Sequence, residues 1–240
     1  MINAKSPVNL FLLFVLITTG CKSVAQDKYI ISVNIDSSEL KYEKLFPPEM
    51  QAKLDSMTKT LNLKPETKIE KEYKESRKNN VAVIYCYDSD TLVKFKNEGA
   101  GSENFIRAIS QAIYYNDTLQ IVTGVGFFAS NSIMIKIAGD GFTGAYNEDA
   151  DHTPVFKYTK NDSNYIDDIT VNALSEKLIL NKRPTFNNGE VLMGEYEGVF
   201  KPFYEKEVGE EHIRKVKWRV IFKCVISNYN ELMIKKLIGK

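Results

Sequence analysis

The clearest indication of the fold class is the segment Val216-Lys217-Trp218-Arg219-Val220-Ile221-Phe222-Lys223-Cys224-Val225-Ile226. Its even-numbered positions are all apolar, and the positions between them are mostly charged. Alternation with a period of two is typical of a β-strand that buries one face. This stretch therefore predicts a core built from β-sheet.

Short segments of similar character precede it from residue 81 onward, separated by turns rich in Gly, Asn and Asp. Many closely spaced short strands favour an antiparallel β-sandwich over residues 81–240, with a β-barrel as the alternative. Asn116-Asp117 predicts a tight hairpin, although residues 103–115 could instead form a short helix. The other expected strands are Val81–Tyr87, Thr91–Lys96, Ile109–Tyr115, Thr118–Thr123, Ser132–Ala138, Gly144–Tyr146, Val155–Tyr158, Glu176–Leu180 and Val191–Phe200, with Leu232–Ile238 as a last candidate.

Composition and charge indicate a globular protein and argue against a nucleic-acid partner. The chain has 240 residues, of which 43% are hydrophobic, enough for one sizeable core. Lys5 carries the only side-chain charge of the first twenty residues, so the remainder holds 31 positive and 31 negative side chains. A neutral chain offers no electrostatic reason to bind nucleic acid, and we expect no nucleic-acid partner.

The N-terminus predicts export. Lys5 precedes the uninterrupted apolar run Leu10–Ile17, which has eight residues. A membrane-spanning helix needs about 20 apolar residues, so this run is too short to span and is typical of a signal peptide, here residues 1–20.

The signal peptide leads into Thr18-Thr19-Gly20-Cys21, which resembles the lipobox of bacterial lipoproteins. The resemblance implies that Cys21 receives a diacylglycerol and that cleavage precedes it, which would anchor the chain to a membrane facing the periplasm or the cell surface. Thr18 stands where the family usually carries an aliphatic residue. Cleavage after Ser23-Val24-Ala25, giving a secreted protein, and a retained anchor are the alternatives.

Residues 21–80 are expected to form the anchor, a spacer and a helical, charged segment. Residues 22–30 form the spacer, and Tyr29–Ile35 is a candidate strand that overlaps its end. After Pro47-Pro48, Glu49–Leu63 has apolar residues at helical spacing. Residues 64–80 carry dense charge of both signs, typical of an exposed helix or linker.

Besides Cys21, the chain contains Cys86 and Cys224, both in predicted strands. In an oxidising compartment they could form a disulfide. Two buried thiols that act as small hydrophobic groups are the alternative. A catalytic role for Cys224 is disfavoured, because it lies on the apolar face of its strand.

Three motifs resemble chemical sites, but their context argues against each. Gly139-Asp140-Gly141-Phe142-Thr143-Gly144 matches a dinucleotide-binding pattern, yet no helix is expected after it, so turns explain the glycines better. Asn147–His152 is rich in oxygen ligands but lacks the EF-hand spacing, and we expect a hydrated loop. Glu195 and Glu197 share one face of a strand, where an outward polar face is expected. We expect no catalytic residue, cofactor or metal.

Aromatic residues gather in the predicted β region and suggest a binding surface. Tyrosine offers apolar area with a polar tip, which suits protein and carbohydrate interfaces. The candidates for such a surface are Tyr196, Phe203 and Tyr204.

The order of segments over residues 100–240 resembles the uncharacterised β-sandwich lipoproteins common in Bacteroidota. The resemblance depends on an alternating isoleucine strand followed by a strand with a small residue, any residue and Tyr, and on two later strands. The residues concerned are Leu119-Gln120-Ile121, Ser132–Ile137, Gly144-Ala145-Tyr146, Gly194–Gly198 and Phe222-Lys223-Cys224. The family's glycine two residues before the last Phe is absent here. The resemblance implies a fold and a compartment, and it carries no catalytic residues.

These observations predict an exported, lipid-anchored, non-enzymatic binding protein of the bacterial envelope. Its partner would be a protein, for example a toxin capped by an immunity lipoprotein, or an envelope polymer. The alternatives are a small-ligand carrier and a hydrolase of envelope polymer. A tyrosine-lined cavity would favour the carrier, and converging carboxylates in a cleft would favour the hydrolase. The sequence leaves the oligomeric state open.

Overall fold

The computed structural model describes residues 27–40, 78–88, 91–93, 95–97, 101–126, 130–150 and 153–229. The predicted signal peptide, Cys21 and the helix predicted at Glu49–Leu63 lie outside the described residues. A candidate strand at Leu232–Ile238 does as well. Among the residues described, no helix is both long enough and apolar enough to cross a membrane.

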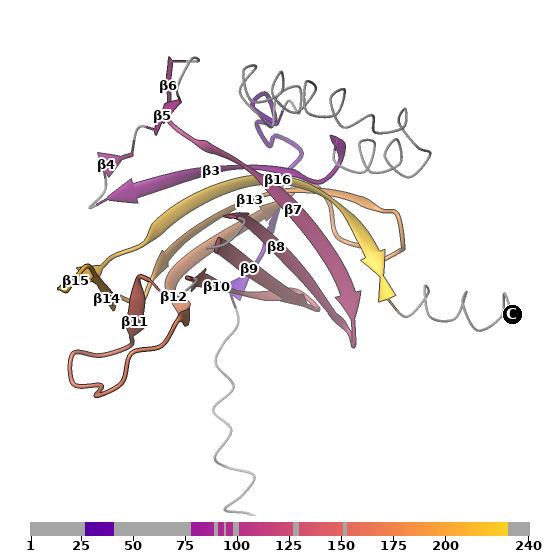
Figure 1. The fold of residues 1–240 in the computed structure, drawn as a ribbon. Helices are drawn as coiled ribbons and strands as arrows, with labels where there is room; N and C mark the ends of the chain where they lie inside the picture. The colour runs from indigo at the N-terminus through magenta and orange to yellow at the C-terminus, as the bar shows by residue number, and fades with distance from the viewer. Residues whose placement is uncertain are drawn as a thin grey trace, which may run out of the picture.

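Eight strands close into an antiparallel barrel (Figure 1). Around the barrel their order is β3, β7, β8, β9, β10, β12, β13, β16 and back to β3. Their bounds are β3 (Val81–Asp88), β7 (Ile106–Tyr115), β8 (Thr118–Gly126), β9 (Ser130–Ala138), β10 (Gly141–Asp149), β12 (Asp168–Leu180), β13 (Val191–Phe200) and β16 (Lys217–Asn228).

The predicted sandwich is therefore wrong, and the barrel alternative is confirmed. The deciding pairing joins β10 to β12, with Ala145 opposite Asn172 and Asp149 opposite Asp168. Since β10 also pairs with β9, the sheet has no gap at this point where two separate layers could form. Strand patterning alone fits both architectures, because each buries alternate residues.

The remaining strands extend the barrel or stand beside it. β1 (Asp27–Lys28) pairs with β10, β2 (Ile30–Ile31) runs parallel to β12, and β4 (Thr91–Leu92) pairs with β3. The predicted spacer over 22–30 is thus too long, because its last residues join the barrel. The separate small sheets consist of β5 (Phe95–Asn97) with β6 (Gly101–Glu103), and of β11 (Val155–Lys157), β14 (Phe203–Glu207) and β15 (Glu210–Arg214).

Aromatic side chains fill the barrel interior. Phe142, Tyr146, Tyr196, Phe200 and Phe222 are each at most 1% exposed. Neighbouring rings pack in edge-on or tilted contacts, such as Tyr146 with Phe200 at 5.7 Å and Phe142 with Tyr196 at 6.5 Å between centroids. An eight-stranded barrel encloses a space about as wide as its own side chains, so these rings can fill it.

A second, smaller core lies outside the barrel wall on β3 and β16. Val83, Tyr85 and Ile221 are buried there against residues that include Ile35 and Leu40 of the N-terminal segment. Both faces of β3 are consequently covered. This explains why Val81–Tyr87 is a continuous apolar run rather than an alternating one.

The β7–β8 hairpin confirms the strand prediction for this region and excludes the helical alternative over 103–115. Asn116 and Asp117 form its two-residue turn with φ angles of 48° and 58°. Both angles lie in the left-handed region that this tight turn requires and that Asn and Asp tolerate.

Replacing Gly144 by Ala should destabilise the barrel by about 1–3 kcal/mol, the usual cost of overpacking. A Cβ at residue 144 would overlap the hydroxyl of Tyr196 and lie 2.6 Å from Glu176 Oε2, so the buried ring would have to move. Denaturant unfolding measures the change. The control Thr143→Ala, on the opposite face of β10, should shift stability by about 0.5 kcal/mol or less. Equal stability of the two variants would contradict this close packing.

Candidate functional site

The predicted binding residues do not share one surface. Tyr196 and Phe203 have no exposed area and belong to the core, whereas Tyr204 is half-buried. Phe203 and Tyr204 are neighbours on β14, and successive residues of a strand point to opposite faces. Of the three, only Tyr204 is placed where it can contribute to a surface.

Of the two alternatives that the sequence left open for Cys86 and Cys224, the structure shows free thiols and no disulfide. Cys86 lies opposite Trp218 in the β3–β16 pairing, six residues from Cys224, which corresponds to about 20 Å along β16. A disulfide needs Cα atoms within about 7 Å. Burial raises the pKa of each thiol to about 12, so neither is a ready nucleophile at neutral pH.

Two other motifs have structural roles. Glu195 lies on the outer side of β13, where its carboxylate accepts a hydrogen bond from Arg219 Nε at 2.8 Å. Gly139 turns the chain between β9 and β10 with a φ of 59°. Gly144 lies within β10, so the glycine pattern leads into a strand and lacks the helix that a dinucleotide site requires.

The acidic stretch ends outside the described residues, which do not include Asp151 and His152. In the part of the chain that is described, no three His, Cys, Asp or Glu side chains are grouped so that they could hold a metal ion.

The sheet of β11, β14 and β15 has two different faces. Figure 1 shows it beyond one end of the barrel, away from the C-terminal end of β16. Register places Phe156, Glu205 and His212 opposite one another, and Lys157, Tyr204 and Ile213 in the next row. Because neighbouring rows face opposite ways, the sheet has one face with Phe156 and Glu205 and another with Lys157 and Tyr204.

The first face belongs to a buried polar cluster that we define as Tyr146, Glu148, Glu205 and Arg214. The Tyr146 hydroxyl lies 2.8 Å from Glu148 Oε2 and 2.7 Å from Asn131 Oδ1. Arg214 Nη1 donates to Glu205 Oε2 at 2.6 Å. Glu148 is 8% exposed and Glu205 4%.

Burial is the largest influence on the pKa of two members of this cluster, Glu148 and Tyr146. It raises the pKa of Glu148 above its ordinary value, against the hydrogen bond from Tyr146 and the charge of Arg214. It raises the pKa of Tyr146 as well, so that hydroxyl stays protonated. A buried carboxyl with a raised pKa is one feature of a general acid, but both carboxylates here are covered and already paired.

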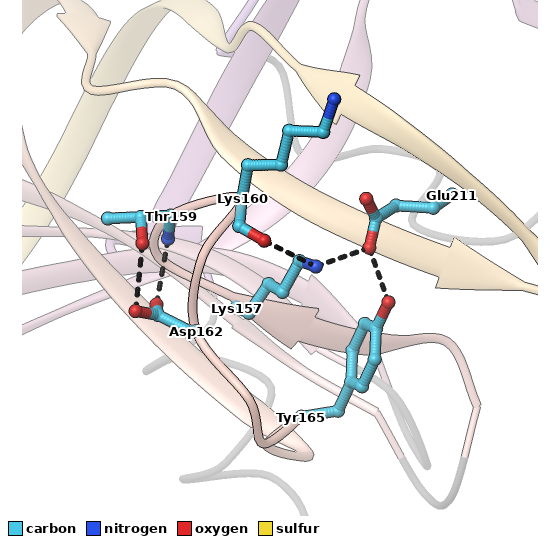
Figure 2. A network of polar contacts seen from close by, with 6 residues as sticks. All are labelled: Lys157, Thr159, Lys160, Asp162, Tyr165 and Glu211. Carbon is cyan, nitrogen blue, oxygen red and sulfur yellow. Dashed lines mark hydrogen bonds and ion pairs between the residues drawn. The ribbon is translucent and has the colours of Figure 1, made fainter.

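The second face carries a lysine clamp, which we define as Lys157, Tyr165 and Glu211 (Figure 2). Lys157 Nζ lies 2.6 Å from Glu211 Oε2 and donates to the Lys160 carbonyl at 3.1 Å. The Tyr165 hydroxyl donates to the same carboxylate oxygen. The Lys157 amine also lies 5.5 Å from the ring centre of Tyr204, so the side chain is held on several sides and is only 8% exposed.

In the clamp, Lys157 stays positively charged, Glu211 stays negatively charged and Tyr165 stays protonated. Hydrogen bonding to Glu211 raises the pKa of Lys157, and the bond from Lys157 lowers the pKa of Glu211. The bond to Glu211 raises the pKa of Tyr165. A lysine that acts as a nucleophile or base needs a lowered pKa, so this arrangement is suited to holding the chain in place.

What the clamp holds is the loop of residues 158–167. At the base of this loop, Phe156 of β11 and Ile166 exchange two backbone hydrogen bonds, each at 2.8 Å. Within the loop, Asp162 accepts hydrogen bonds from the Thr159 amide and hydroxyl, each at 2.8 Å (Figure 2). The loop is therefore ordered by its own contacts as well as by the clamp.

A pocket of about 370 Å³ lies in this loop, and we call it the loop pocket. Tyr158 lines it and is 50% exposed. The remaining lining residues are Lys157, Asn161, Asp162, Ser163, Asn164 and Ile166. Its lining combines one aromatic residue with several side chains that can form hydrogen bonds, and it is more polar than most small-molecule sites.

Comparison of the chain with protein-family models, with curated proteins and with solved structures finds no match. The resemblance to Bacteroidota lipoproteins stays a prediction.

Sequence reasoning missed the clamp and the loop pocket. Lys157 and Glu211 are 54 positions apart and meet only through the register of β11, β14 and β15. The one local signal is the polar run Thr159–Asn164 between two apolar segments, which indicates a loop without indicating a site.

Replacing Glu148 by Gln should make stability less dependent on pH. Because its pKa is raised in the folded protein, Glu148 stabilises the fold most fully at pH below its ordinary value of 4.5, and this contribution is lost as the pH rises. Unfolding free energies measured from pH 4 to 8 should therefore favour Glu148→Gln over wild type increasingly as the pH rises. The exposed Glu207→Gln provides the control. A difference that shrinks with pH would show that Arg214 stabilises the Glu148 carboxylate more than burial opposes it.

Replacing Glu211 by Gln should loosen the loop selectively. Lys157 and Tyr165 would lose the carboxylate that joins them, so the backbone amides of Phe156 and Ile166 should exchange hydrogen faster. Hydrogen exchange measured by mass spectrometry reads this change. The matched control is Glu210→Gln on the same strand, and amides of β12 and β13 should be unaffected in both variants. Unchanged exchange at Phe156 and Ile166 would show that the clamp does not hold the loop.

Proposed function

We propose that this chain is an exported, lipid-anchored, non-enzymatic binding protein of a bacterial envelope. Its partner, a protein or an envelope polymer, would dock at the barrel end formed by β11, β14, β15 and the 158–167 loop. The lipobox-like sequence before Cys21 supports the anchor. The observation that supports the binding role most is the packed barrel interior, because any ligand or partner would then bind on the outer surface of the barrel.

The buried tyrosines support this choice over a small-ligand carrier. A carrier would need tyrosines that line a cavity, whereas Tyr146 and Tyr196 pack against other rings. Their hydroxyls are engaged by Glu148 at 2.8 Å and by Glu176 at 2.9 Å. Side chains that satisfy one another in this way are typical of a core rather than of a ligand site.

The clamp and its loop support an outer site. Holding a loop in place before a partner arrives reduces the ordering cost of binding. Lys157 is only 8% exposed, and burying a lysine costs free energy. Core packing alone does not explain its fixed position, because the loop that Lys157 holds contains no fully buried residue.

A hydrolase of envelope polymer is the second candidate, favoured by Glu148 and Glu205 in the buried polar cluster. Arg214 lies beside Glu205, and its charge lowers the pKa of Glu148 against the effect of burial. Glycoside hydrolysis uses two carboxyl groups with different pKa values. The low exposure of both residues favours the binding role.

The deciding experiment compares wild type with Cys21→Ala, each expressed in a diderm bacterium and recovered from the envelope by affinity capture. Wild type should carry a diacylglycerol on Cys21 and fractionate with membranes, whereas Cys21→Ala should be found in the soluble fraction. Both should retain the same envelope component. Mass spectrometry reads the lipid and the partner.

An unlipidated Cys21 in wild type would contradict the anchor. Recovery of the partner in cleaved form, with cleavage lost in Glu148→Gln, would replace the binding role with the hydrolase. Recovery of only a small organic molecule would favour the carrier.

A further inference from the structure

We propose that the loop pocket binds one uncharged sugar ring of an envelope polysaccharide. Tyr158 stacks on the apolar face of the sugar, and Asn161, Ser163 and Asn164 form hydrogen bonds with its hydroxyl groups. The inference rests on the proposed function, since it names the ligand class for the same end of the barrel.

Tyr158, which directly follows β11, is the one aromatic residue that lines the loop pocket. Its side chain is 50% exposed, although the ring alone is large enough to make burial favourable. A sugar ring presents C–H groups on its faces and hydroxyl groups around its edge. An exposed ring beside hydrogen-bonding groups complements both parts at once.

The polar wall has unused hydrogen-bonding capacity. Asn161, Ser163 and Asn164 are exposed, and none of the three side chains forms a hydrogen bond within the described part of the chain. Their neighbour Asp162 is different, because Thr159 occupies both of its carboxylate oxygens. An asparagine side chain both donates and accepts, as neighbouring sugar hydroxyls require.

The charge of the pocket favours a neutral ligand. Lys157 is paired with Glu211, so its ammonium group is already compensated. The remaining carboxylate, that of Asp162, has its pKa lowered mainly by the hydrogen bond from the Thr159 amide. The carboxylate of Asp162 would repel a phosphate or a uronic acid, which carries the same sign of charge. Among the described residues that line the pocket, no unpaired cation offsets this repulsion.

The volume and the broad mouth of the pocket suit a single sugar ring of a longer polysaccharide. Its volume of about 370 Å³ lies near the small end of the range for ligand pockets, about 300–1,000 Å³. The mouth is broad, which leaves room for a polymer to continue beyond the bound ring. A protein anchor residue would instead need an apolar pocket, and this lining is mostly polar.

The test is a titration, followed by NMR, of the full chain carrying Cys21→Ala. The probes are the neutral sugars maltotriose, mannotriose and chitotriose, with trigalacturonate as the charged comparison. At least one neutral trisaccharide should shift the amide resonances of Tyr158, Asn161 and Asn164. Tyr158→Ala should weaken its binding about tenfold, because the stacking surface is lost.

The matched control is Tyr115→Ala at the tip of the β7–β8 hairpin. Tyr115 is also 50% exposed and lies outside the loop pocket, so this variant should bind as wild type does. Thermal unfolding confirms that both variants are folded. An Asn161→Ala and Asn164→Ala double variant gives a second measure, with weaker binding expected.

Binding of none of the neutral trisaccharides would overturn the proposal, as would equal or tighter binding of trigalacturonate. Equal affinity of Tyr158→Ala and Tyr115→Ala would overturn it as well. If Tyr158→Ala still captures the envelope partner of wild type, the sugar site fails while the proposed function stands. If the chain carrying Cys21→Ala binds a trisaccharide but wild type captures no envelope component, the proposed function fails instead.

Discussion

The pairing of β10 with β12 closes the barrel, and both the packing of the interior and the position of the candidate site follow from it. It joins the two ends of a strand series that would otherwise remain an open sheet with two exposed edges. Once closed, eight strands leave an interior that side chains fill, and Gly144 on β10 provides the space for the hydroxyl of Tyr196. The aromatic residues inside the barrel are thereby committed to packing, and the binding site that we propose lies on the outer surface.

Closure of the barrel also fixes the position of the candidate site. The chain between β10 and β12 has to leave and re-enter the barrel at the same end, because Asp149 pairs with Asp168. The chain after β13 leaves toward that end too, since Phe200, the last residue of β13, lies opposite Ala173 in the first half of β12. Two excursions that are distant in sequence therefore meet as β11 and β14, and the lysine clamp forms across them.

Much of the strand content could be predicted, because it depends on local alternation. The β7–β8 hairpin followed from Asn116-Asp117, and the outward face of Glu195 followed from its position beside Tyr196. β15 was missed, since Glu210–Arg214 lies at the surface and shows little apolar alternation. Aromatic content alone could not show which candidate binding residues reach the surface, because it does not distinguish Phe203, inside, from Tyr204, one residue later on the opposite face.

The alternation of apolar residues is enough to establish a core built from strands, and the N-terminal apolar run predicts export. Both are local properties, since they need only the period of apolar residues and the length of an apolar run. Only the tertiary structure decided between sandwich and barrel, kept Cys86 from Cys224, and joined Lys157 to Glu211. These outcomes depend on register between strands far apart in the chain, and alternation is the same for every register that keeps the apolar face inward.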